Sequence, residues 1–198
     1  MHNLEEFIFY GKIFNENELF KLLKCASSSN MERRTDSTNI KDISLQKGNR
    51  NVSFNVNLKN FNYDKIIQKY ILNLSDEHKP HFNNLFFFNE YFIDDKITRY
   101  DKSDGYMWHT DFNVKTNGVR CLSTITYLND NYDGGETQFI NKTIQPKKGN
   151  TLIFPSCWTF PHQGNLVTSG SKLIYVCHFW ISPKKTNKIN FYLPAMYS

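Results

Sequence analysis

The spacing of apolar and polar residues predicts helices before about Leu85 and mainly strands after it. In the first part, apolar residues recur at helical spacing around 19–23 and over Tyr63 to Leu74, which predicts two helices with one apolar face each. Asn15, followed three residues later by Glu18, forms a capping-box pattern that predicts the start of the first helix. The apolar run from Phe7 to Phe14, just before it, suits a strand.

From about Leu85 onward the pattern changes to short β-type runs separated by Gly-containing turns such as Asp133-Gly134-Gly135. The predicted strands are Leu85 to Phe92, Lys96 to Tyr100, Leu122 to Leu128, Thr137 to Ile140, Thr151 to Phe154 and Leu173 to Trp180. Strands of this length and spacing predict a sandwich or jelly roll rather than an α/β sheet. The polar stretch from Ser27 to Arg50 predicts a mobile loop.

Composition narrows the class of protein further. The 198 residues include 17 Phe and 11 Tyr, so the chain has the bulky apolar side chains that disordered proteins lack. No apolar run is long enough to span a bilayer, and the N-terminus lacks the basic and apolar regions of a signal peptide. We therefore expect a cytoplasmic protein. Its four cysteines show no metal-type spacing and are expected to stay reduced.

The net charge of +5 arises entirely from the C-terminal third, because no Asp or Glu follows Glu136 while seven lysines do. A basic third suggests a nucleic-acid partner first. Three of these lysines, Lys184, Lys185 and Lys188, follow the last predicted strand, where a solvated tail is the simpler interpretation.

One short motif points to metal chemistry. His109 and Asp111 lie two residues apart, so on an extended strand both side chains project from the same face. His162 offers a third ligand 53 residues later. Two His and one carboxylate on one face of an octahedron leave three positions open, as a non-haem Fe(II) oxygenase requires. Ten residues further, Lys172 enters an apolar strand, where it must reach solvent or meet an anion such as a carboxylate.

Several further motifs occur in order around these residues. They are Arg99-Tyr100, Gly105-Tyr106, Arg120, Thr126-Tyr127-Leu128-Asn129, Asp133-Gly-Gly-Glu-Thr137, Pro146 to Gly149, Phe154-Pro155 and Val167 to Lys172. With the His-Asp-His set, residues of about 85 to 183 resemble the 2-oxoglutarate- and Fe(II)-dependent dioxygenases, specifically their prolyl 4-hydroxylase-like branch.

This resemblance implies a mainly β fold with supporting helices, in which a double-stranded β-helix, a cupin-like jelly roll, forms the core. It implies that His109, Asp111 and His162 hold Fe(II) and act as the catalytic centre. It implies that Lys172 binds the distal carboxylate of 2-oxoglutarate with help from the cosubstrate-binding residues Tyr100, Thr137 and Tyr127. It also implies that Arg120 lies on the substrate side.

The activity implied is hydroxylation of an unactivated C–H bond in a peptidyl proline or a small amino-acid substrate. The reaction consumes O2 and decarboxylates 2-oxoglutarate to succinate and CO2, and ascorbate is a further cofactor that the resemblance allows. The implied partner is thus a peptide or a small molecule, without a membrane, and the pattern is silent on oligomeric state. We expect one dioxygenase domain over 1–198, with an N-terminal strand and supporting helices in 1–84, the jelly-roll catalytic core in 85–183 and a C-terminal tail in 184–198.

The sequence departs from the branch at one position. Six residues after Lys172, where a Trp is usual, the chain has His178, and the Trp is Trp180. The residues 172, 174, 176, 178 and 180 share strand parity, so His178 either lines the cavity or is a hydrogen-bonded core histidine. If it faces the cavity, it makes the substrate side more polar.

Three alternatives remain to be weighed. Oxidative demethylation of nucleic acid would suit the basic third, but those enzymes place two arginines after the distal His, and no Arg follows Arg120. A halogenase is disfavoured because it needs a vacant site in place of Asp111. A non-catalytic jelly-roll binding module predicts a broken triad or no Lys172, and the sequence shows neither.

Overall fold

The computed structural model describes residues 4–40, 43–54, 56 and 61–183. The chain's helical segments are η1 (Leu4–Phe7), α1 (Glu16–Ser28), α2 (Asp64–Asn73) and α3 (Lys79–Phe88). The longer strands are β1 (Phe9–Lys12), β2 (Glu32–Ile40), β3 (Ile43–Phe54), β4 (Asn89–Tyr100), β5 (Tyr106–His109), β7 (Gly118–Tyr127), β11 (Asn150–Pro155) and β14 (Lys172–Pro183). The shorter strands are β6 (Val114–Lys115), β8 (Asp133–Gly134), β9 (Thr137–Phe139), β10 (Thr143–Ile144), β12 (His162–Gly164) and β13 (Val167–Ser169).

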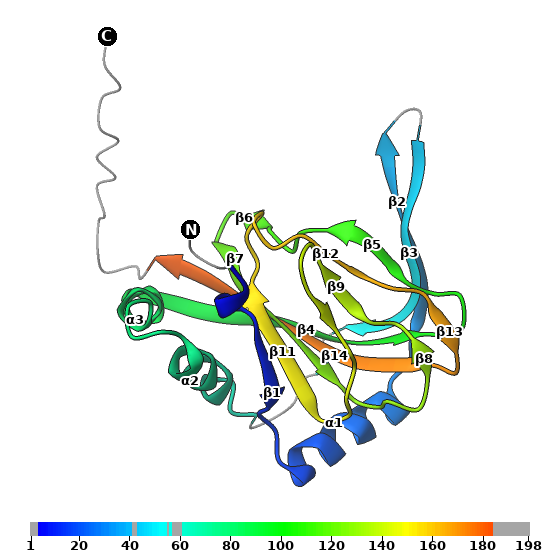
Figure 1. Cartoon of the computed structure of the whole chain (residues 1–198), viewed down its shortest axis with the longest axis horizontal. Coiled ribbons are helices and arrows are strands. Elements are labelled where there is room, and N and C mark those ends of the chain that lie inside the picture. The colour runs from blue at the N-terminus through cyan, green and yellow to red at the C-terminus, as the bar shows by residue number, and fades with distance from the viewer. Residues whose placement is uncertain (1–3, 41–42, 55, 57–60, 184–198) are drawn as a thin grey trace.

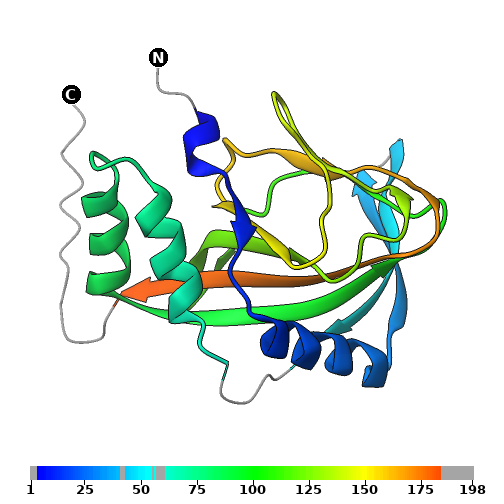
Figure 2. The same ribbon diagram turned by 60° about the horizontal axis from the view of Figure 1, so that its bottom comes forward.

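Two antiparallel sheets face each other across the site. The larger has the strand order β1-β11-β7-β14-β4-β3-β2, with β6 added beside β7, and the smaller has the order β10-β9-β12-β5. Helices cover the outer face of the larger sheet, and the smaller sheet covers its inner face (Figures 1 and 2). This is the mainly β, jelly-roll architecture with supporting helices that the sequence predicts.

Strand parity divides the core into two clusters. Along β14, Tyr175, Cys177 and Phe179 pack against the helices, whereas Ile174 and Val176 point between the two sheets. Alternate residues of β14 face two different apolar layers. Both faces of the strand are therefore apolar, except where the strand borders the site. The four cysteines form no disulfide, as expected.

The N-terminal helices begin close to where the sequence predicts. Helix α1 starts after Asn15, whose side chain accepts from the Glu18 backbone N–H at 3.0 Å, while Glu18 accepts from the Asn15 backbone N–H at 2.9 Å. The reciprocal pair confirms the capping box. Helix α2 buries Ile66, Ile67 and Tyr70 against the sheet, as the helical spacing predicts.

Two sequence predictions are wrong. The stretch from Ser27 to Arg50 is not a loop: β2 and β3 form a hairpin whose inner end pairs with β4, and which projects from the body of the molecule (Figure 1). The polar residues of this stretch do not indicate a loop, because one of them, Arg33, is held by a two-pronged ion pair with the buried Asp104 at 2.5 Å. The predicted strand Leu85 to Phe92 is helix α3 as far as Phe88.

The aromatic residues that favour a strand here instead form a helical face. Pro80 lies in the first turn of α3, where a missing N–H costs nothing. Phe82 and Phe86, four residues apart, then pack on one side, with the Phe82 ring 5.3 Å from the ring of Tyr70. Among the described helices, none is long and apolar enough to cross a lipid bilayer. The cluster Lys184, Lys185 and Lys188 lies outside the described residues.

Candidate functional site

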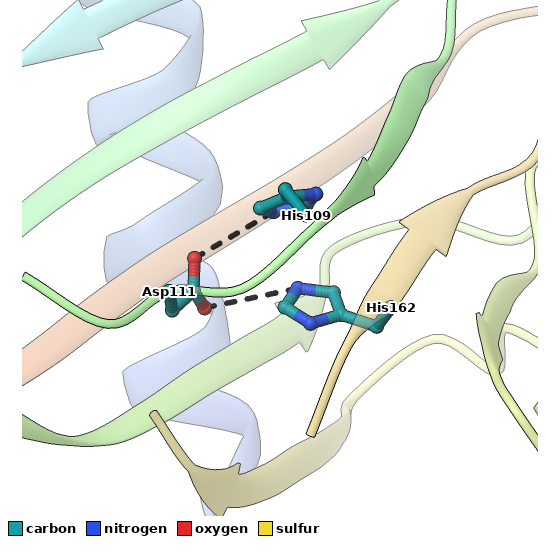
Figure 3. A group of neighbouring side chains, drawn as sticks. All are labelled: His109, Asp111 and His162. Atoms are coloured by element: carbon teal, nitrogen blue, oxygen red, sulfur yellow. Dashed lines mark ion pairs between the residues drawn. The ribbon is translucent and has the colours of Figure 1, made fainter. Parts of the chain in front are cut away.

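The three side chains predicted to bind a metal converge between the two sheets. His109 ends β5, Asp111 follows two residues later, and His162 begins β12, directly opposite His109 in the strand pairing. One ligand atom from each lies within 4.8 Å of the others. Figure 3 shows both imidazoles turned toward the Asp111 carboxylate, with Nε2 of His109 at 3.6 Å and Nε2 of His162 at 3.7 Å from its oxygens.

Backbone carbonyls fix the orientation of both imidazoles. His109 Nδ1 donates to the Met107 carbonyl at 2.7 Å, and His162 Nδ1 donates to the Phe160 carbonyl at 3.1 Å. A carbonyl oxygen only accepts, so the proton of each ring lies on Nδ1 and the lone pair lies on Nε2. Rings held in this way present Nε2 to a metal, as second-shell hydrogen bonds do in known metal sites. The N, N and O donors fit a divalent first-row ion such as Fe(II).

The protonation states of the three side chains also suit metal binding. Burial lowers the pKa of His162 to about 4, so this imidazole is neutral at physiological pH. Burial alone would raise the pKa of Asp111, but His178, His109 and His162 surround the carboxylate and hold its pKa well below 3.8. The site therefore presents a carboxylate and at least one neutral imidazole, the protonation states in which these groups bind a metal.

The deep end of the same site contains a buried lysine. Lys172, the first residue of β14, is 3% exposed, and its Nζ donates to the Gly135 carbonyl at 2.6 Å. The ammonium group lies 5.5 Å from the ring centres of both Tyr100 and Tyr127. The Tyr127 and Thr137 hydroxyls are hydrogen-bonded to each other at 2.8 Å. These hydroxyls and the ammonium group provide the donors that a carboxylate needs.

Burial lowers the pKa of Lys172 from 10.5 to about 8, and the charge of Glu136 opposes this shift. A buried ammonium group whose charge is costly is stabilised by any anion that reaches it. The ammonium group thus remains charged at neutral pH, and a bound carboxylate would stabilise this charged form.

One cavity of about 290 Å³ joins the two ends of the site. His109, Asp111 and His162 line one part of it, and Lys172, Tyr100 and Thr137 line another. The structure therefore brings together seven of the eight site residues predicted from the sequence as lining residues, Arg120 included. The eighth, Tyr127, reaches the cavity region through its hydrogen bond to Thr137.

His178 stands where the sequence departs from the prolyl 4-hydroxylase-like pattern. It both lines the cavity and is a hydrogen-bonded core histidine. It is 3% exposed, lines the cavity, and its Nδ1 lies 3.2 Å from the Ser123 hydroxyl and 4.0 Å from Asp111 Oδ2. Burial lowers its pKa to about 3, so the ring is neutral. Trp180 instead stacks on Phe92 and donates to Asp94 at 2.9 Å.

Sequence reasoning missed two cationic residues that line the cavity, Arg50 from β3 and Lys96 from β4. Lys96 shares strand parity with Thr98 and Tyr100, so the assignment of Tyr100 to the site was a usable signal for Lys96. Arg50 had no such signal, because the hairpin that carries it was not predicted. The Arg50 guanidinium lies over the Tyr106 ring, 4.3 Å from its centre.

A His-Asp-His set inside a jelly roll defines a class, the non-haem metal site with open coordination positions. Comparison with known families narrows this class. Residues 96–182 match the model of the 2OG-Fe(II) oxygenase superfamily, where 2OG is 2-oxoglutarate. The match covers the core of the chain and confirms the resemblance that the motifs indicate.

Two individual relatives support the match to this superfamily. Over 91 residues, 43% of this chain, it is 35% identical to a PKHD-type hydroxylase of Synechococcus sp. (strain CC9902). Over 82 residues, 36% of the chain, it is 30% identical to a putative prolyl 4-hydroxylase of Acanthamoeba polyphaga mimivirus. The matches span only 39% and 33% of the lengths of these two relatives.

The fold is also found in a solved structure. A Pseudomonas putida prolyl-4-hydroxylase superposes with a TM-score of 0.59 at 16% identity, covering 89% of this chain and 92% of that one. At this identity the likeness establishes the shared fold.

Proposed function

We propose that the chain is an Fe(II)- and 2-oxoglutarate-dependent dioxygenase, similar to prolyl 4-hydroxylases, that hydroxylates an unactivated C–H bond. The substrate is a peptidyl proline or a small amino acid. In the balanced reaction, R–H, 2-oxoglutarate and O2 give R–OH, succinate and CO2. The observation that carries the proposal is that a His-Asp-His set and a buried lysine line one cavity.

In this proposal His109, Asp111 and His162 hold Fe(II), and Lys172 binds the distal carboxylate of 2-oxoglutarate. The Tyr100, Tyr127 and Thr137 hydroxyls add hydrogen bonds to that carboxylate, and Arg120 binds substrate. Once bound, the iron and 2-oxoglutarate together supply the activation of O2.

The residues of this chain bind, orient and shield the reactants. The carbonyls of Met107 and Phe160 hold the two imidazoles, so that Nε2 is always turned toward the metal position. Lys172 fixes one end of 2-oxoglutarate, which leaves its keto acid end at the metal. Burial of His162 and Lys172 excludes bulk water from both ends of the cavity.

We also propose that the chain works as one dioxygenase domain. Support comes from the core beneath the large sheet, where Leu22 of α1 and Ile66 of α2 pack in the same cluster as Ile97, Leu122 and Phe179 of the sheet. The N-terminal helices would then stabilise the sheet that carries the site.

The direct experiment is to measure succinate formation from 2-oxoglutarate with Fe(II), O2 and ascorbate, while screening proline-containing peptides and amino acids. We expect substrate-stimulated succinate formation with one hydroxylated product per succinate. Lys69 is an exposed lysine on α2, and Lys69→Met should form succinate at the wild-type rate. Metal-independent succinate formation, or none with any substrate, would contradict the proposal.

A further inference from the structure

The substrate side of the cavity carries an excess of positive charge. The cavity is lined by four cationic side chains, Arg50, Lys96, Arg120 and Lys172, and among the described lining residues Asp111 supplies the only carboxylate. In the proposed function, Lys172 and Asp111 are engaged by 2-oxoglutarate and iron. Since the dianion of 2-oxoglutarate balances Fe(II), the positive charges of Lys96 and Arg120 remain for a substrate to meet.

The carboxylate of Asp94 offsets part of this excess. Asp94 lies 3.4 Å from Arg120 Nη2, and it also accepts from the Trp180 indole N–H and lies 4.0 Å from Lys115. Asp94 is thus shared among several donors and at most balances Arg120, which leaves the charge of Lys96. The loaded cavity therefore keeps the positive charge of Lys96.

Lys96 is the member of this group with the least compensation. It is partly buried, and within the described parts of the chain no side chain forms a hydrogen bond or ion pair with its ammonium group. Burial lowers its pKa, the charge of Asp111 opposes that shift, and the charges of Arg50 and Arg120 add to it. A charge kept in such a position without a partner is a cost to folding unless a ligand meets it.

Arg120 also has unused donor capacity. One terminal nitrogen donates to the Asp111 backbone carbonyl at 3.0 Å, which fixes the guanidinium at the cavity wall. Its Nε–H is buried and has no hydrogen-bond partner among the described residues. His178 adds a further polar group to this wall where an apolar side chain would suit the ring of an internal proline.

We propose that the substrate presents a carboxylate to the basic cluster formed by Arg50, Lys96 and Arg120, so that it is a small carboxylic acid such as a free or N-acylated amino acid. An internal proline residue of a peptide is neutral and would leave the charge of Lys96 without a counter-charge. The cavity volume of about 290 Å³, which 2-oxoglutarate also occupies, suits a small molecule. This inference rests on the proposed function.

The test compares each acid with its own amide. N-acetyl amino acids, proline among them, and their primary amides are titrated by calorimetry into protein loaded with Mn(II) and 2-oxoglutarate without O2. The internal-proline probe is N-acetyl-glycyl-prolyl-glycinamide. For at least one amino acid we expect the acid to bind about 10- to 100-fold more tightly than its amide, since a charge-assisted interaction is lost. Amides or the peptide binding as tightly as the acids, or no acid binding at all, would overturn the inference.

Variants assign the effect to the cluster. Lys96→Met should weaken binding of the preferred acid by about tenfold or more and leave the binding of its amide unchanged, whereas Lys96→Arg should retain most of the affinity. Lys69→Met should change neither. Affinity for 2-oxoglutarate within about twofold of wild type shows that the Lys96→Met site is still folded. Equal acid affinity in Lys96→Met and wild type would overturn the role of the cluster.

The two proposals fail in different ways. If 2-oxoglutarate does not bind in the presence of Mn(II), the proposed function itself is wrong. If 2-oxoglutarate binds normally but acids and amides bind alike, only the assignment of the carboxylate is wrong.

Discussion

Replacing Lys172 by Met should stabilise the ligand-free protein while weakening its binding of 2-oxoglutarate. The substitution keeps the length of the side chain and removes its charge. Burial lowers the pKa of Lys172 from 10.5 to about 8, a shift that corresponds to about 3 kcal/mol of unfavourable free energy for the charged form in the folded state. This destabilisation is lost in Lys172→Met.

The hydrogen bond from Nζ to the Gly135 carbonyl acts in the opposite direction. Its loss costs about 1.5 kcal/mol, so the net stabilisation at pH 7 should be about 1 to 2 kcal/mol. For a chain of this length, that raises the Tm by roughly 2–8 °C. Cosubstrate binding should fall by about 30-fold to several thousandfold, because a buried ion pair loses one partner.

The pH dependence supplies a further check. Below pH 8 the lysine is charged in both the folded and unfolded states, and the full cost is present. Between pH 8 and 10.5 the folded state releases its proton first, so the unfolded state binds more protons and wild-type stability rises with pH. The advantage of Lys172→Met should therefore shrink over this window, vanish near its middle and reverse toward its upper end, where only the lost hydrogen bond remains.

Urea denaturation at several pH values, without metal or 2-oxoglutarate, measures the first effect, and calorimetry with Mn(II) in the absence of O2 measures the second. Lys69→Met serves as the matched lysine substitution and should change neither quantity. A Lys172→Met protein that is clearly less stable than wild type at pH 7, or that binds 2-oxoglutarate as tightly as wild type, would refute the reasoning.

Three further substitutions test other parts of the structure. Asp111→Asn removes the charged ligand and should abolish Mn(II) binding measured by calorimetry; wild-type affinity would exclude this residue from the metal site. Asn15→Ala removes the cap that pairs with Glu18 and should lower the free energy of unfolding by about 1 kcal/mol in urea; no change would show that the cap is not stabilising. Asp104→Asn breaks the ion pair with Arg33 and should cost about 1–3 kcal/mol by the same assay, with an unchanged midpoint counting against a role in anchoring the hairpin.

The central part of the site could be predicted from the sequence because local spacing determines it. His109 and Asp111 lie two residues apart at the end of a strand, and Lys172 opens a strand whose parity places it on the inner face. Such patterns need no knowledge of which strands pair. His162 was identified by its motif, and pairing of β12 with β5 then brings it opposite His109.

The rest of the site depends on long-range pairing that local patterns do not encode. Arg50 reaches the cavity only because β3 joins the edge of the sheet beside β4, and its polar neighbours favour a loop when considered locally. Helix α3 was missed because Phe82 and Phe86 have high strand propensity. Their helical arrangement is stabilised by tertiary contact with residues such as Tyr70.

The most direct test of the central claim is calorimetric titration of 2-oxoglutarate into the protein with and without Mn(II), in the absence of O2. In the proposed function the metal and Lys172 each bind one end of the molecule, so binding should require the metal and should be weakened strongly in both Asp111→Asn and Lys172→Met. Binding that is equally tight without metal, or the absence of binding with it, would contradict the account of this cavity as a 2-oxoglutarate and Fe(II) site.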